Sequence, residues 1–147
     1  MNDRETFDRI KRVLKGQDLA VLSTIGKRYP YQNIVSFSVS RDFKHIFFAT
    51  SRATVKYANI KRCPRVSMFV DNRTNSELDL LEAVGVTAIG DAQEVRSGAL
   101  KLKLSSYIRR HPHLKGFADS PGVSLFSIRV RAYFVVTRFQ EVSEVKF

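Results

Sequence analysis

The residues best suited to chemistry lie between two short apolar segments, in the run Thr50-Ser51-Arg52-Ala53-Thr54-Val55-Lys56. The segments on either side, residues 46–50 and 66–70, are rich in aromatic and β-branched residues and are typical of buried strands. Between them the sequence predicts a helix that ends near Arg62, because Pro64 disfavours helical geometry in the residue before it. A hydroxyl-rich turn therefore joins a strand to a helix.

This predicted helix start has the composition of an anion site. Thr54 is expected to be the N-cap residue, and Lys56 falls in the first helical turn. Free backbone N–H groups, hydroxyls and an ammonium would then converge on one point, as they do where a helix start binds phosphate. An ordinary capped helix with a solvated lysine has the same spacing, so the spacing alone leaves both interpretations open.

The pattern T-x(3)-[ST]-x-K at residues 50–56, with Pro64 eight residues after the lysine, resembles the pyridoxamine phosphate oxidase-like FMN-binding split barrels. The stretch 30–38 is similar to the second strand of that family, whose backbone runs beside the flavin. The resemblance extends over about residues 19–139 and depends on the order of several elements.

The resemblance implies an FMN-dependent oxidoreductase and a role for each part of the site. Thr54 and Lys56 would bind the FMN phosphate, and the backbone of residues 33–36 would orient the flavin ring. The hydroxyls of Thr50 and Ser51 and the guanidinium of Arg52 would line the ribityl chain. No catalytic acid or base is identified, because hydride transfer by a flavin does not require one. The residues expected to bind the cofactor are Asn33, Ile34, Val35, Ser36, Thr50, Ser51, Arg52, Thr54 and Lys56.

Three positions depart from the vitamin-processing oxidases of the family. Asn33 and Ser38 stand where those enzymes carry an Arg and a Lys that reach the phosphate, and Val55 replaces an Arg. Oxidation of pyridoxamine phosphate itself is therefore not expected, and the substrate stays unidentified. Related split barrels accept deazaflavin or haem, so a non-enzymatic module that binds flavin, deazaflavin or haem is the alternative.

Composition favours one globular domain spanning residues 1–147, with 44% hydrophobic residues and eleven phenylalanines. No apolar run is long enough to cross a membrane, and the charged N-terminus does not resemble a signal peptide. The single cysteine, Cys63, excludes an intrachain disulfide and favours a reducing cytoplasm. The sequence contains no His/Cys cluster with metal-ligand spacing, so no metal site is expected.

The formal net charge is +11, and the basic residues are dispersed along the chain. This distribution favours attraction of a small anionic substrate or a nicotinamide reductant over nucleic-acid binding. A basic barrel that binds a nucleic-acid strand is the weaker alternative, because the aromatic residues mostly fall on predicted core faces.

The predicted fold is mainly β (α+β), a six- or seven-stranded antiparallel split β-barrel with peripheral helices. Gly85 and Gly90 interrupt one strand, and glycines within strands indicate the bends that curl a sheet into a barrel. The resemblance implies a homodimer with flavin at the subunit interface. Strands are predicted over residues 19–25, 31–39, 45–50, 66–70, 80–95 and 126–137, and helices over 2–16, 54–62 and 97–110.

Two further expectations concern the C-terminal half. In residues 126–136 the even positions form an apolar face, while Arg129, Arg131 and Tyr133 share the other face, which would meet solvent or a second subunit. The segment 109–113 contains two histidines and is predicted to be a solvated loop. His45, at the start of a strand, is predicted to be a surface residue.

Overall fold

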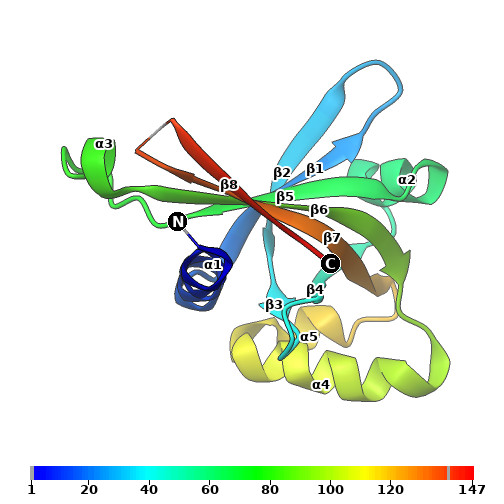
Figure 1. Ribbon diagram of the computed structural model, residues 1–147. Helices are drawn as coiled ribbons and strands as arrows, with labels where there is room; N and C mark the ends of the chain where they lie inside the picture. Colours follow the sequence, from blue (N-terminus) through cyan, green and yellow to red (C-terminus); the bar gives the residue numbers. More distant parts are fainter. Residues whose placement is uncertain (1, 139) are drawn as a thin grey trace.

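The strands form one antiparallel sheet with the order β2-β1-β5-β6-β7-β4-β3, and β8 pairs with β7 (Figure 1). This computed structural model describes residues 2–138 and 140–147, so Phe139, the last residue of the stretch that resembles the family, lies outside the described residues. The strands are β1 (Leu19–Ile25), β2 (Pro30–Ser36), β3 (Ser38–Val39), β4 (His45–Ser51), β5 (Arg65–Asp71), β6 (Val84–Glu94), β7 (Val123–Thr137) and β8 (Glu141–Lys146). The helices are α1 (Asp3–Gly16), α2 (Val55–Arg62), α3 (Asp79–Glu82), α4 (Leu100–Arg110) and α5 (Lys115–Ala118), with short 3-10 turns at Ser97–Ala99 and Pro112–Leu114.

The predicted fold class is confirmed: the sheet curls into a half-barrel, and the helices lie at its periphery (Figure 1). The described part of the chain contains eight strands, more than predicted. The second predicted strand breaks at Phe37 into β2 and β3, and the sequence analysis did not identify β8. Among the described residues, no helix has the length and apolar character needed to cross a membrane.

Helix α1 begins with the capping box that the spacing of Asn2 and Glu5 suggests. The Glu5 amide donates to Asn2 Oδ1 at 2.9 Å, and the Asn2 amide donates to Glu5 Oε2 at 3.3 Å. The helix buries Ile10, Val13 and Leu14 against the sheet and ends at Gly16, as predicted.

Strand β6 pairs along its whole length with residues 126–137 of β7, with one irregularity. Ile89 lies opposite Ala132 and Gly90 opposite Val130, so Arg131 is an extra residue in β7 and forms a β-bulge. A Cβ atom on Gly90 would lie 2.2 Å from the Arg129 carbonyl oxygen, so only glycine fits without a shift. The prediction that glycine marks a bend in this strand is confirmed at Gly90.

The bulge reverses the side-chain alternation of β7, so the predicted apolar face is wrong beyond Val130. Tyr133, predicted on the polar face, is fully buried, and its hydroxyl donates to the Phe43 carbonyl oxygen at 2.7 Å. Phe134 and Val136, predicted in the core, are half-exposed on the other face of the sheet. A period of two cannot reveal an inserted residue, because the residues on either side of it still alternate.

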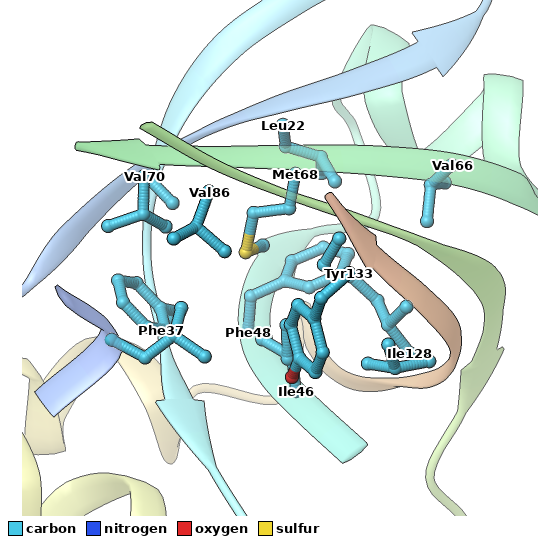
Figure 2. Close-up of a cluster of buried hydrophobic side chains, with 14 of the residues drawn as sticks. Leu22, Phe37, Ile46, Phe48, Val66, Met68, Val70, Val86, Ile128 and Tyr133 are labelled. Carbon is cyan, nitrogen blue, oxygen red and sulfur yellow. The ribbon is translucent and has the colours of Figure 1, made fainter. Parts of the chain in front are cut away.

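Two apolar clusters cover the two faces of β4. The main core contains Ile46 and Phe48, together with Met68 and Tyr133, as Figure 2 shows. Phe47 and Ala49 point the other way, into a second cluster with Tyr107 of α4, Ala118 and Leu125. Because both faces are covered, β4 is buried almost throughout and forms a fixed base for the turn that follows it.

The segment before Pro112 is not the solvated loop that was predicted. His111 is buried, and its Nε2 lies 2.6 Å from the Phe37 carbonyl oxygen. Arg110 donates to the carbonyl oxygens of Leu14 and Gln17, which ties α4 to the end of α1. These partners lie more than 70 residues away in the sequence, so the local pattern could not reveal them.

We expect Gly90→Ala to lower the free energy of unfolding by about 1–3 kcal/mol, because the added methyl group overlaps the β7 backbone. Gly116→Ala is the matched control, because its Cβ would meet nothing within 4 Å and it lies in α5. Urea unfolding of both variants measures the difference. Equal stability of the two variants would contradict the assigned close approach.

Candidate functional site

The turn after β4 is organised by two threonine hydroxyls. Thr54 is the N-cap of α2, as predicted: its Oγ1 accepts from the Tyr57 amide at 3.3 Å. The same hydroxyl donates to the Ser51 carbonyl oxygen at 2.8 Å and lies 3.1 Å from Thr50 Oγ1. The threonines therefore hold the turn in shape, and Thr50 joins it to the buried strand.

Unmatched positive charge collects at the start of α2. Within the described residues, the amides of Val55 and Lys56 have no hydrogen-bond acceptor, and Lys56 has no carboxylate within 4 Å. The Lys56 side chain is half-buried, and this burial lowers the pKa of its ammonium group. An anion bound here would accept from both amides and restore the interaction that the ammonium loses with water. The arrangement fits a phosphate group.

Helix α2 is fixed against the β1–β2 hairpin. Asn59 is buried and donates from Nδ2 to Thr24 Oγ1 at 3.0 Å. Arg62 donates to the Ile25 carbonyl oxygen at 2.8 Å. These bonds hold the start of α2 in a constant position relative to β1 and its neighbour β2.

The second group of predicted cofactor residues, residues 33–36, lies on β2 at the edge of the sheet. In an edge strand, the backbone N–H and C=O groups that face away from the neighbouring strand make no hydrogen bonds within the sheet. Val35 is buried in the core and Ile34 is 66% exposed, so a planar ligand beside this edge would meet mainly backbone. Asn33 Oδ1 is buried without a hydrogen-bond partner in the described part of the chain. Strand β2 also contacts β4, the strand that leads into the turn.

Arg52 is engaged within the chain. Its Nε donates to Ser124 Oγ at 2.8 Å, its Nη1 donates to the Pro121 carbonyl oxygen at 2.6 Å, and its amide donates to the Gly122 carbonyl oxygen at 2.9 Å. Arg52 therefore fastens the turn to the start of β7. Its predicted place along a ribityl chain stays a prediction.

The sequence analysis missed Glu94, whose side chain is 12% exposed at the end of β6. Its carboxylate accepts from Ser124 Oγ at 2.5 Å, and this bond is the chief cause that lowers the pKa of Glu94. Lys61 lies 3.5 Å away, Arg96 3.4 Å and Arg52 3.7 Å. Ser124 and Lys61 lie at least 30 residues from Glu94 in the sequence, so no local motif could have identified this network.

The turn is an open surface in a single chain. In the described part of the chain, pockets of about 300–430 Å³ lie elsewhere, with linings that do not include residues 50–56. The described residues also contain no group of three or more His, Cys, Asp or Glu side chains that could hold a metal ion. The described chain thus supplies a group of anion-binding donors at an exposed turn.

A family model described as Pyridoxamine 5'-phosphate oxidase matches residues 6–137 of the chain. This range includes β2, the turn after β4 and the whole of α2. A comparison with curated protein sequences finds no significant match.

Solved structures share the fold at low sequence identity. A heme binding protein from Mycobacterium smegmatis is 16% identical with a TM-score of 0.80, over 92% of this chain and 55% of that one. A FAD-binding protein from Mesorhizobium loti is 18% identical with a TM-score of 0.69, over 94% and 90% of the two chains. General Stress Protein 26 from Bacillus anthracis is 19% identical with a TM-score of 0.73, over 97% and 99%. The chain therefore spans about half the length of the Mycobacterium protein.

We expect Glu94→Gln to lower the free energy of unfolding by about 1.5–3 kcal/mol at pH 7, because charge-assisted hydrogen bonds are lost. The folded-state pKa of Glu94 lies below its ordinary value of 4.5. The stabilisation by the ionised form is therefore complete above pH 4.5 and is lost as the pH falls towards the folded-state pKa. Thermal melting across pH 3–7 should show the two proteins converging in acid.

The control for this prediction is Glu144→Gln, which removes a carboxylate from an exposed pair with Lys146. We expect almost no change, because exposed ion pairs contribute little. A pH-independent difference between the wild type and Glu94→Gln would contradict the assigned role of the carboxylate.

Proposed function

Because the chain belongs to the pyridoxamine 5'-phosphate oxidase family, we propose that it binds FMN and acts as an oxidoreductase on a small molecule. The observation that carries the proposal is the half-buried Lys56 at the start of α2, beside two amides that have no acceptor among the described residues. A phosphate group satisfies all three donors at once.

Each part of the chain would have a separate task in holding the cofactor. Lys56 and the amides of Val55 and Lys56 would bind the phosphate, and the hydroxyl of Ser51 would face the ribityl chain. Thr50 is buried and bonded to Thr54, so it would support the turn. Thr54 would contribute by stabilising the turn, because its hydroxyl already donates a hydrogen bond to the Ser51 carbonyl oxygen. The backbone N–H and C=O groups on the free edge of β2 would form hydrogen bonds with the edge of the flavin ring.

FMN, when bound, supplies the capacity to accept and return a hydride. The chain's own contribution would be to orient the ring and to limit the access of water. The buried Val35 and the core behind β2 provide a rigid support for that purpose. No side chain is assigned as a catalytic acid or base. A small anionic substrate or a nicotinamide reductant fits the net charge of +11.

A homodimer would enclose the site that one chain leaves open. The face of the sheet opposite the main core carries a row of apolar side chains on β1, β5, β6 and β7: Val21, Phe69, Ile89, Phe134 and Val136. Phe69 and Ile89 are each 37% exposed in the single chain. Burying this row against a second copy would remove apolar surface from water.

The spectrum of the purified protein tests the identity of the cofactor. FMN gives a yellow preparation, and mass spectrometry of the released molecule separates FMN from FAD and deazaflavin. A Soret band would instead indicate haem, in line with the printed description of the Mycobacterium smegmatis protein. A colourless protein that carries nucleic acid would overturn the flavoprotein proposal.

We expect Lys56→Ala to weaken FMN binding ten-fold or more, because it removes a charge-assisted contact of about 1.5–3 kcal/mol. Riboflavin lacks the phosphate, so its affinity should change little. Titration of apo-protein with both ligands, followed by flavin fluorescence, measures the two effects.

Lys27→Ala is the matched control for Lys56→Ala, because it removes the same charge from the exposed turn between β1 and β2. It should bind FMN like the wild type. The phosphate assignment fails if Lys56→Ala and the wild type bind FMN equally well.

We expect a particle of about twice the 16.8 kDa chain mass in light scattering at micromolar concentration. Phe69→Glu should shift this particle towards the monomer, since it places a charge in the apolar row. Leu102→Glu is a control outside that row and outside the cofactor turn, because Leu102 is 75% exposed on α4. A wild-type monomer that holds FMN tightly would contradict the dimer.

A further inference from the structure

A pocket of about 430 Å³ lies where β4, β6 and β7 meet α4, on the face of the sheet opposite the main core. Two rows of side chains cross its floor, because residues directly opposite on antiparallel neighbours point to the same side. One row is His45, Arg129 and Asp91, and the next includes Ser127 and Gln93. Figure 1 shows the end of β6 turning into the segment that leads to α4 beside this floor.

The carboxylates at this pocket already have cationic partners. Asp91 accepts from Arg131, and Glu94 is paired with Lys61 and Arg96. Glu94 also accepts a hydrogen bond from Ser124 Oγ. Neither carboxylate is therefore free to neutralise a further cation.

Two cations at the pocket have no such partner. In the described part of the chain, neither Lys103 nor Arg129 has a carboxylate within 4 Å. Lys103 is half-buried and lies with its Nζ 5.4 Å from the centre of the Phe47 ring. The ring holds this ammonium on the pocket side of α4 without neutralising it. Two positive groups at one cavity repel each other, and a bound anion would attract both of them and so offset this repulsion.

Hydrogen-bonding groups at the floor are also unused. The side chains of Ser127 and Gln93 make no hydrogen bond to other described residues, although both line the pocket. The guanidinium of Arg129 can present two parallel N–H groups to a phosphate or carboxylate. The volume is within the range of small-molecule sites.

We propose that this pocket binds a small organic dianion, such as a phosphate monoester or a dicarboxylate. Arg129 and Lys103 balance its two charges, while Ser127 and Gln93 bind its polar groups. None of residues 50–56 lines the pocket, although Glu94 of the pocket pairs with Arg52 of the cofactor turn at 3.7 Å. The proposal therefore does not depend on flavin binding.

Calorimetric titration of the protein as purified tests the proposal with three aromatic probes. Phenyl phosphate and phthalate are dianions, and benzoate carries a single charge. We expect at least one dianion to bind at least ten-fold more tightly than benzoate, and the stronger of the two identifies phosphate or carboxylate as the preferred group. Binding of neither dianion, or equal binding of all three probes, would overturn the proposal.

Two variants locate the binding. Lys103→Met keeps the apolar contact with Phe47 and removes the charge, and Arg129→Gln removes the guanidinium from an exposed position. Each should weaken binding of the preferred dianion ten-fold or more. Lys101→Met removes the same charge from an exposed position of α4 that does not line the pocket, and it should bind like the wild type.

If Lys101→Met weakens probe binding as much as the pocket variants do, the net charge of the protein attracts the probe and the pocket is not a specific site. Wild-type affinity in both Lys103→Met and Arg129→Gln would also reject the pocket. Circular dichroism of each variant confirms folding, and the two substitutions lie on different elements, so either one alone can decide the outcome.

Discussion

The close approach of Gly90 to the Arg129 carbonyl oxygen is the constraint on which the arrangement of this sheet depends. It allows β6 and β7, the two longest strands, to stay paired across a bulge. On one side of the bulge Ile128 and Val130 face the core, and on the other side Tyr133 and Val135 do so. Because the sheet bends here, one continuous strand serves both ends of a curved core.

The bulge also divides the outer face of the sheet into two chemically different halves. Before it, β6 presents Thr87 and Ile89 beside apolar side chains of β5 and β7. After it, β6 presents Asp91 and Gln93 beside charged and polar side chains of β7 and β4. The first half has the character of a protein interface, and the second has the character of a polar ligand pocket. The same backbone irregularity thus separates the surface proposed for the dimer from the pocket proposed for an anion.

The candidate cofactor turn depends on rigid support at several distant points. Strand β4 is covered by apolar clusters on both faces, so Thr50 occupies a fixed position. Arg52 fastens the turn to the start of β7, and Asn59 fastens α2 to β1. Glu94 balances the charge of Arg52 and Lys61 from a nearly buried position. Lys56, in contrast, is left without a carboxylate in the described chain, which is the condition that an anion-binding group requires.

Local sequence determined the helices α1 and α2, most of the strands, and the chemistry of the turn, but it did not reveal β8. The hydroxyl of Thr54 and the stop before Pro64 define α2, and the spacing of Asn2 and Glu5 defines the start of α1, because caps depend on residues only a few positions apart. An antiparallel barrel followed from the apolar strands and from Gly85 and Gly90, and the split-barrel form followed from the family resemblance of residues 50–56 and Pro64. Tertiary structure alone decided which way Tyr133 points, that His111 is buried, and that Glu94 binds Ser124 and Lys61. It also gathered Lys103 and Arg129, dispersed in the sequence, at one pocket. The physical reason is that side-chain partners across a sheet are set by strand register and bulges, and register depends on contacts between residues far apart in the chain.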